Sequence, residues 1–430
     1  MDVGEPDRAS GSRFILVLAG CLVLCLGAMA AFTTAVDPYQ YLNTPLREGF
    51  NARKTAIFYQ LHITKSYAFK RGDTRNLILG TSRAGRAIST AHPTLKGDNF
   101  YNFATPGSQP RLDYLKLQAA IDRGGMQRAI FFIDFFTFNT AASLPPGFVE
   151  DYSARLSPPA SIEALLQCVA DFSAYFWSYQ SLTDSARTVR EQDLAEAGQL
   201  NYNTLLNDGR WDLNFSPERN ILQAFQRLER SYLRGSWFPV DDPRFSLRED
   251  ADNRNPAFTD LHRLLELAQK NNIDLTLVML PVHARLLENM DRAGLWEHFE
   301  VWKRRVVDIN ESVAARTASA AFEVWDFNGY NAFATEPVSS TTVDGELKWM
   351  HDAGHPTEAA GNKILDIIAG APDTGFGDRI DGRNIDDWIS SQRLHRDRYR
   401  AAHPDTVRQV ERQVKRFRQR YPWRVEPLSG

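Results

Sequence analysis

The amino-acid sequence predicts an α/β protein whose mostly parallel sheet is doubly wound, with helices on both of its faces. Short apolar runs of strand length alternate with helical segments, and parallel strands need such helical connections between them. Residues 129–133 form a continuous apolar run, which is typical of a strand buried on both faces. Two further features accompany the sheet: an apolar stretch near the N-terminus, and a long interruption of the alternation between residues 140 and 255.

The composition indicates a sizeable core and no general affinity for nucleic acid. The chain has 430 residues, enough for one large domain with insertions or for two domains; 43% of them are apolar, and the net charge is −3. Cys21 and Cys25 lie in the apolar N-terminal stretch, which leaves Cys168 alone in the remainder. We therefore expect no intramolecular disulfide in that part and no nucleic-acid partner.

The N-terminal apolar stretch has the length of a membrane span. Residues 14–32 are 19 residues without a charge, which at about 1.5 Å per residue just cross a bilayer core. Two arginines before the stretch and an aspartate after it favour an N-terminus on the inner side. We expect an uncleaved single-pass anchor. The alternatives are a cleaved signal peptide, because residues 28–30 resemble a signal-peptidase site, a lipoprotein, because residues 18–21 resemble a lipoprotein box, and a buried helix.

The chain divides into segments of different character. We expect a cytoplasmic tip and membrane anchor over 1–35, a lead-in over 36–75, a catalytic domain over 76–370 interrupted by an insertion over 140–255, and a charged helical tail over 371–430. The insertion is rich in aromatic residues and is predicted to pack beside the sheet, either as a cap over the site or far from it. Predicted strands cover residues 76–79, 99–104, 129–134, 273–280 and 321–327. Predicted helices cover residues 111–121, 256–271, 285–318 and 357–369.

A candidate nucleophile follows the first predicted strand. Gly80 allows a sharp turn after the buried run 76–79, and Ser82 then lies at the carboxyl edge of the sheet, where open α/β folds place their sites. The same pattern also fits a plain turn or a helix cap. The stretch therefore predicts catalysis only if other residues support it.

Asp352 and His355 supply that support. A carboxylate three residues before a histidine can accept the imidazole Nδ1 proton and leave Nε2 free to take a proton from a serine hydroxyl. A metal site built on His351 and His355 is the alternative, but that motif needs a continuous helix, and Gly354 and Pro356 argue against one. A structural loop without chemistry is the third interpretation.

Three motifs follow one another along the chain: strand-Gly-x-Ser, Asn102 with Gly107 after the second strand, and Asp-x-x-His before the last helix. In this order they resemble the motifs of the SGNH (GDSL-like) hydrolase superfamily. The resemblance covers residues 76–139 and 256–369 and implies a flavodoxin-like fold without a cofactor. It implies that Ser82, His355 and Asp352 form a catalytic triad, and that the backbone N–H groups of Ser82 and Gly107 form an oxyanion hole. Thr81 stands where the family usually has Asp, as in its membrane-anchored branch of polysaccharide O-acetyltransferase-like and D-alanyl-transfer-related proteins.

The third block of the family departs from the expected pattern. The family has Gly-x-Asn-Asp after the third strand, whereas residues 134–139 here read Asp-Phe-Phe-Thr-Phe-Asn. Asn139 is the candidate replacement for the missing oxyanion donor. Two further residues are candidate substrate contacts: Arg83, which follows the serine and has a salt bridge as its alternative role, and His283, which lies just past a strand end.

The function implied is an envelope-facing serine acyl esterase or O-acyltransferase that acts on a polysaccharide or glycan. Its location would be the inner membrane, with the bulk of the chain on the periplasmic or extracytoplasmic side. The alternative is a catalytically inactive, membrane-anchored binding or scaffold protein whose partners are envelope assembly proteins. A metal-dependent hydrolase is a weaker third hypothesis. The charged runs of the tail fit a solvated helix, or contact with an anionic polymer or membrane surface.

Overall fold

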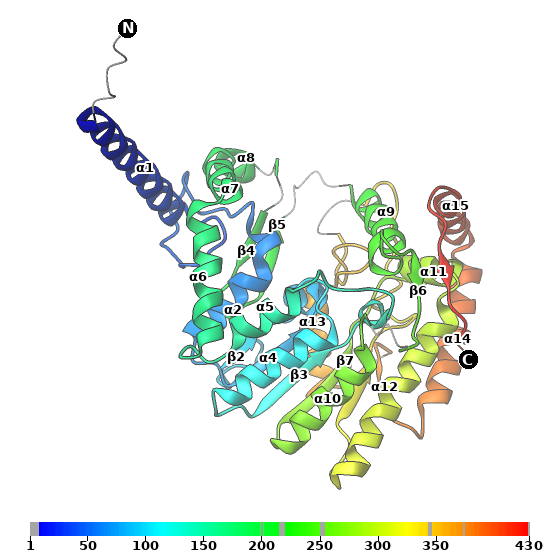
Figure 1. The fold of residues 1–430 in the computed structure, drawn as a ribbon. Coiled ribbons are helices and arrows are strands. Elements are labelled where there is room, and N and C mark those ends of the chain that lie inside the picture. Colours follow the sequence, from blue (N-terminus) through cyan, green and yellow to red (C-terminus); the bar gives the residue numbers. More distant parts are fainter. Residues whose placement is uncertain are drawn as a thin grey trace.

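Figure 1 shows the fold in a computed structural model that describes residues 8–197, 199–200, 202–214, 220–249, 254–342, 346–372 and 375–428. Parts of four predicted segments lie outside the described residues. These are residues 1–7 of the N-terminal tip, residues 198, 201, 215–219 and 250–253 of the insertion, residues 343–345 of the catalytic domain, and residues 373–374 and 429–430 of the tail.

The centre of the molecule is a six-stranded, mostly parallel sheet in the order β2-β1-β3-β7-β8-β9. The strands are β1 (Asn76–Gly80), β2 (Phe100–Asn102), β3 (Arg128–Phe132), β7 (Asp274–Met279), β8 (Glu323–Asp326) and β9 (Asp378–Ile380). All neighbours pair in parallel except β8 and β9, which are antiparallel. The chain leaves β1 for β2 on one side and continues with β3 on the other. The strand order therefore reverses at β1, and ligands of open α/β sheets bind at such a point.

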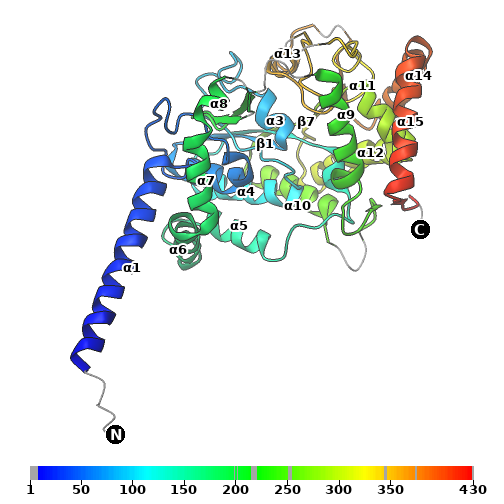
Figure 2. The ribbon, with the colours of Figure 1, turned by 90° about the horizontal axis from the view of Figure 1, so that it is seen from above.

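Apolar side chains cover both faces of the sheet. Along β1, Leu77 and Leu79 belong to one core cluster and Ile78 to another, as the alternation of strand side chains requires. The larger cluster also includes residues of α4 (Pro110–Asp122), α10 (Ala257–Lys270) and α12 (Trp296–Thr317). The other cluster includes residues of α3 (Ser82–Ala87) and α13 (Glu358–Ile368). Figure 2 shows these two groups of helices from above. Burial on both faces explains why the central strands β1 and β3 are largely apolar.

The predicted elements of the sheet are confirmed, with two corrections. The helix predicted over 285–318 is two helices, α11 (Ala284–Arg292) and α12, because the chain turns at Gly294, whose φ is +89°. The strand predicted over 321–327 is not the last one, because β9 adds an antiparallel edge strand beyond residue 370. The first part of the predicted tail, up to β9, therefore belongs to the central sheet.

An apolar helix projects from the N-terminal end. Helix α1 (Arg8–Val36) contains 26 residues, Gly11–Val36, that are long and apolar enough to cross a membrane. Its outer part is exposed, and its C-terminal part packs against α6 (Ile162–Trp177) and α7 (Tyr179–Arg190). The lead-in after α1 forms a 3₁₀ turn, η1 (Ile57–Gln60), and α2 (Leu61–Arg71).

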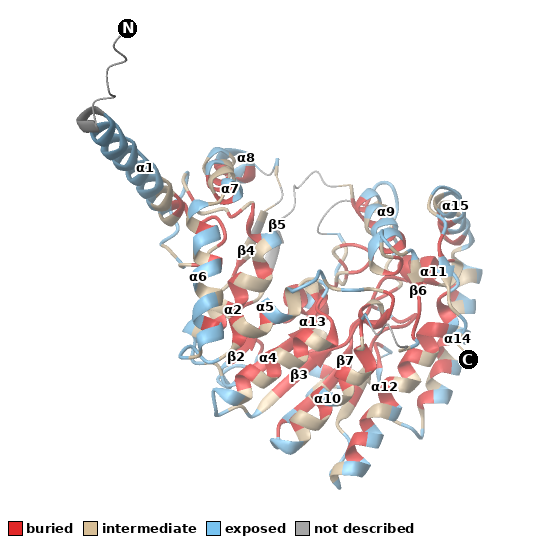
Figure 3. Cartoon of the chain, in the orientation of Figure 1, coloured by how far each residue is buried: buried red, intermediate tan, exposed pale blue. Residues whose placement is uncertain are grey.

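The segment predicted as an insertion is spread along one side of the molecule. Besides α6 and α7 it contains α5 (Phe148–Leu156), α8 (Gln192–Glu196), the antiparallel pair β4 (Tyr202–Leu205) and β5 (Trp211–Asn214), α9 (Ile221–Ser231), an irregular turn, η3 (Tyr232–Ser236), and β6 (Arg244–Phe245). Within this segment, α6 and α7 pack against α1, and α9 packs against α11. Figure 3 shows that the exposed surface of this region includes one side of α6.

The C-terminal tail is folded against the body. Helix α14 (Ile385–Ala402) packs on α12, and α15 (Pro404–Arg420) packs on α11. After α15 the chain forms β10 (Arg424–Val425), which pairs in parallel with β6. Val407, Val410 and Val414 of α15 are buried, whereas its arginines are exposed.

Candidate active site

The turn after β1 presents Ser82. Gly80 has a φ of +130°, and a Cβ atom there would lie 2.5 Å from the carbonyl oxygen of Phe132 on the neighbouring strand, so only glycine fits. Thr81 then caps α3: its hydroxyl accepts a hydrogen bond from the N–H of Arg83 (3.4 Å) and donates one to the carboxylate of Asp134. Ser82 is the first residue of α3 and is partly exposed.

Ser82, His355 and Asp352 lie in the arrangement of a catalytic triad. The distance between Ser82 Oγ and His355 Nε2 is 3.0 Å. On the other side of the ring, His355 Nδ1 lies 2.9 Å from Oδ1 and 3.0 Å from Oδ2 of Asp352. Because an ionised carboxylate only accepts hydrogen bonds, Nδ1 carries the proton and Nε2 is free to accept from the serine hydroxyl. The structure thus brings together the three residues predicted from distant parts of the chain.

The electrostatics of the pair suit a general base. Burial lowers the pKa of His355, the negative charge of Asp352 raises it in part, and the nearby positive charge of Arg86 lowers it again. The ring is therefore neutral at pH 7. Burial raises the pKa of the Asp352 carboxyl, but His355 and the positive charge of Arg86 outweigh burial and hold that pKa below its usual range, so the carboxylate stays ionised.

The loop that carries Asp352 and His355 is closed by its own backbone. Asp352 Oδ1 accepts hydrogen bonds from the N–H groups of Gly354 (3.0 Å) and His355 (2.9 Å), and the N–H of His351 donates to the carbonyl of His355 (2.9 Å). A Cβ atom on Gly354 would meet Leu228 at 2.9 Å, so α9 is in close contact with this loop. The alternative metal motif needs its two histidines on one continuous helix. Residues 351–355 do not form a helix, so they lack the geometry of that motif.

Arg83 is not placed to contact a substrate. Its side chain is buried and forms an ion pair with Asp134, which follows β3, and it donates to the hydroxyl of Tyr232 (2.6 Å). The prediction of a substrate contact is corrected on this point, because the guanidinium group lies beneath the serine turn. Its alternative role, a salt bridge to a neighbouring acid, describes what the structure contains.

His283 also has a structural position. Its Nδ1 atom accepts from the N–H of Arg285 (3.2 Å) at the start of α11, and its Nε2 lies 2.7 Å from the carbonyl oxygen of Glu336. Burial lowers its pKa to about 4, and the side chain is fully enclosed. The predicted substrate contact is therefore corrected. Its backbone N–H supports the triad loop instead, through a 3.0 Å hydrogen bond to the carbonyl of Ala353.

The two predicted oxyanion residues beyond Ser82 differ in their surroundings. Gly107 lies in an exposed turn with a φ of +64°, and this turn begins beside the serine turn, because the N–H of Thr105 donates to the carbonyl of Gly80 (2.9 Å). Asn139 is fully buried. Its Nδ2 donates to the carbonyls of Trp237 (2.9 Å) and Arg244 (3.0 Å), and both donor hydrogens are thereby used. The structure does not offer Asn139 as an oxyanion donor, which corrects that prediction.

Two buried charges near the site, Asp113 and Lys116, were not predicted from the sequence. Lys116 donates to Thr105 (3.0 Å), Ser108 (2.8 Å) and Asp113 (2.9 Å), so it holds both ends of the turn that contains Gly107. Asp113 in turn accepts from the N–H of Gly80 (3.3 Å). The spacing of Asp113 and Lys116 on one helix was the only signal available, and it is common on solvated helices.

The comparisons with known proteins add no family assignment: no protein-family model matches this chain, and no curated protein matches it at a significant level.

Proposed function

We propose that this protein is an SGNH-type serine esterase or O-acyltransferase that acts on an acylated polysaccharide or glycan. The single observation that carries the proposal is the 3.0 Å approach of Ser82 Oγ to His355 Nε2, with Asp352 behind the ring. The order of the parallel strands and the helices on both faces of the sheet agree with a doubly wound, flavodoxin-like fold of the SGNH type.

The chemistry follows from the protonation states. Ser82 Oγ attacks the acyl carbonyl carbon while its proton passes to His355 Nε2, and the positive imidazolium is stabilised by Asp352. The tetrahedral intermediate collapses as the ester C–O bond breaks, and the leaving alcohol takes the proton from His355. A water molecule or a sugar hydroxyl then attacks the carbonyl carbon of the acyl-serine and gives its proton to His355. The bond from that carbon to Ser82 Oγ breaks as Oγ takes the proton back from His355, which restores the serine hydroxyl and the neutral imidazole. Water gives hydrolysis, and the sugar gives transfer.

The oxyanion of the intermediate needs hydrogen-bond donors. We assign this role to the backbone N–H groups of Ser82 and Gly107. Removing one such donor from a serine hydrolase costs on the order of 10²–10³ in kcat. Because Asn139 is engaged elsewhere, the third donor of the family pattern is missing, and this favours a second candidate function. In that alternative the chain is an inactive binding or scaffold protein of an envelope assembly complex.

We further propose that α1 anchors the protein in the inner membrane with the body on the extracytoplasmic side. Supporting this, α6 carries an exposed apolar stripe beside α1. Ile162, Leu165, Leu166 and Val169 follow the spacing of one helix face, and Leu166 is 65% exposed. Such a stripe is unusual on a soluble surface and typical of a helix that lies in a membrane interface.

The position of the stripe agrees with a membrane at that end. The indole N–H of Trp177, at the end of α6, donates to the carbonyl of Leu26 within α1 (3.3 Å). Trp177 and Tyr179 are both exposed there, and tryptophan and tyrosine are enriched at membrane interfaces. Figures 1 and 2 place α1, α6 and α7 together at one end of the molecule.

The proposal is tested by turnover of a chromogenic acetyl ester with the full chain in detergent or nanodiscs. We expect Ser82→Ala and His355→Ala to reduce turnover to background. The control Ser319→Ala, which changes an exposed serine two residues past the end of α12, should leave turnover unchanged. Adding an acceptor oligosaccharide and measuring acylated product separates transfer from hydrolysis. Turnover that persists in Ser82→Ala would overturn the assignment, and a folded wild type with no turnover would favour the scaffold alternative.

A further inference from the structure

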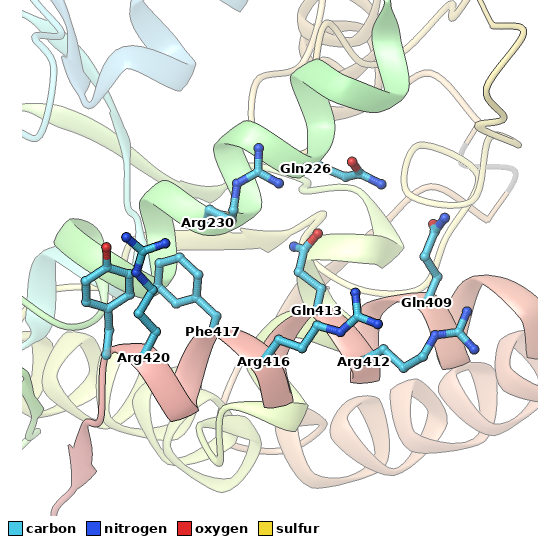
Figure 4. A pocket seen from close by; sticks show the side chains of 9 residues that line it. Gln226, Arg230, Gln409, Arg412, Gln413, Arg416, Phe417 and Arg420 are labelled. Carbon is cyan, nitrogen blue, oxygen red and sulfur yellow. The ribbon is translucent and has the colours of Figure 1, made fainter.

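A cavity of about 690 Å³ lies away from Ser82, between α9 and α15. Figure 4 shows that side chains from both helices point into it. Four arginines line it, Arg230 from α9 and Arg412, Arg416 and Arg420 from α15, and no acidic residue is among its described lining residues. Because the whole chain carries a net charge of −3, this concentration of positive charge is a local feature.

The arginines are spaced regularly along one helix. Arg412, Arg416 and Arg420 are four residues apart, so they follow one face of α15 over about 12 Å. Each is exposed, and none of the four guanidinium groups has an ion-pair partner within the part of the chain that the structure describes. Three positive charges therefore lie in a row, and Arg230 faces them. This arrangement fits a linear ligand with regularly spaced negative charges better than it fits a single small anion.

Uncharged groups in the same groove favour a sugar polymer. Gln226 presents an amide that can pair with hydroxyl groups, and the rings of Phe417 and Tyr421 lie together with centroids 4.9 Å apart. Aromatic rings and amides are groups that bind the apolar faces and hydroxyls of sugars, whereas a polyphosphate offers neither. The planar guanidinium group of arginine can donate two parallel hydrogen bonds to one carboxylate.

The floor of the groove is fixed by buried charges. Gln409 accepts from Arg285 (2.7 Å) and Gln413 donates to Glu229 (2.8 Å), and Arg285 and Glu229 form a fully buried ion pair. The two glutamines are thereby held in place, so α15 keeps a defined register against α9. The groove is therefore a built surface and not a chance contact of two mobile helices.

We propose that this groove binds a linear acidic glycan that carries carboxylates along its length. The inference deepens the proposed function, on which its link to catalysis rests, by naming the charge class of the polymer. Leu228 and Tyr232 lie against Gly354 of the triad loop, whereas Gln226 and Arg230 face the groove. Residues two apart lie on opposite sides of a helix, so only α9 separates the bound polymer from the triad loop.

A membrane surface is the other polyanion that an arginine groove could meet. Figures 1 and 2 place α15 at the end of the molecule opposite α1 in both views. If α1 marks the membrane, the groove lies at the end of the molecule far from it, and a lipid headgroup layer does not reach α15. This geometry favours a polymer in the extracytoplasmic space.

The test is a binding measurement with the full chain carrying Ser82→Ala, held in neutral phosphatidylcholine nanodiscs. The probe is a hexamer of galacturonate, with a neutral hexasaccharide, polyphosphate and anionic vesicles as comparison ligands. We expect the acidic hexasaccharide to bind more tightly than any of them, with an affinity that falls as salt rises. Replacing Arg412 and Arg416 by Gln should weaken binding at least tenfold. The control, Arg398→Gln, removes one positive charge from an exposed position of α14 outside the groove and should have no effect.

The outcomes are distinct. Equal binding of the neutral hexasaccharide, tighter binding of polyphosphate or vesicles, or equal binding by the Arg412 and Arg416 double variant would overturn the inference. Because both altered arginines are exposed, thermal unfolding of the double variant should match that of the parent, which checks that a loss of binding is not a loss of folding. Binding is measured without catalysis, so failure of ester turnover leaves this result standing, and failure of binding leaves the triad assignment standing.

Discussion

Arg83 and Asp134 form a buried ion pair directly beneath the turn that presents Ser82. Asp134 also accepts a hydrogen bond from Thr81, so one carboxylate holds the residues on both sides of the serine. The pair joins the end of β3 to the start of α3. It fixes the direction in which the serine hydroxyl leaves the sheet.

Removing one partner of this pair should destabilise the protein strongly. Arg83→Met leaves the Asp134 charge buried without its ion-pair partner, and we expect a loss of about 3–5 kcal/mol in the free energy of unfolding. Denaturant unfolding of the full chain in detergent measures it. Arg379→Met, which breaks an exposed pair with Glu323, is the control and should cost less than about 1 kcal/mol. Similar losses for the two variants would contradict this role of Arg83.

The pH dependence of activity should follow His355. The ring must be neutral to act as a base, and its pKa is lowered by burial and by Arg86, so activity should persist below pH 6.5. Arg86→Gln removes a positive charge that disfavours the protonated ring. The pKa of His355 should then rise, and the acid limb of kcat/KM should move to higher pH. An acid limb that stays in place or moves to lower pH would show that Arg86 does not act on His355.

Asn139 should affect stability and not the chemical step. Asn139→Ala removes two donated hydrogen bonds to the carbonyls of Trp237 and Arg244 and leaves buried groups unpaired, at a cost of about 1–3 kcal/mol for each group. Measured on the folded fraction, kcat for the acetyl ester should stay within about threefold of wild type. If instead kcat falls by 10²–10³ while stability is unchanged, Asn139 is an oxyanion donor after all.

The apolar stripe of α6 should lie in the lipid. An NBD fluorophore on Leu166→Cys, in a full chain whose Cys21, Cys25 and Cys168 are changed to serine, should emit at shorter wavelength in nanodiscs and be quenched several-fold by doxyl-labelled lipids. The control is Leu394→Cys, another exposed leucine, on α14 at the far end of the molecule. Quenching of the Leu166 probe by aqueous iodide, or by neither quencher, would exclude contact with lipid.

Local sequence patterns predicted the strands of the sheet and the three residues of the triad. They did not predict features that depend on contacts between residues far apart in the sequence. β1, β3 and β7 are apolar runs that any central parallel strand requires, and Ser82, Asp352 and His355 each lie in a short motif with its own geometry. β9 has three residues, of which only Ile380 is buried, so no pattern marks it. The partners of Asn139 lie about a hundred residues further along the chain, and nothing near Asn139 indicates them.

The side chains of Arg83 and His283, predicted as substrate contacts, are turned into the protein by partners from distant parts of the chain. Arg83 and His283 both follow strand ends, which is where ligands bind, but position along a strand does not say which way a side chain turns. Arg83 turns inward because Asp134 and Tyr232 receive it. His283 turns inward because it caps α11 and meets Glu336. Only the packing of α9, α11 and the sheet decides these directions.

The most direct test of the central claim is peptide mapping after treatment of the folded full chain with a fluorophosphonate. We predict one covalent adduct, on the Oγ atom of Ser82, that is lost in His355→Ala because the serine is then no longer deprotonated by a base 3.0 Å away. An adduct on another residue, or a folded wild type that remains unmodified, would contradict the assignment of Ser82 as the nucleophile.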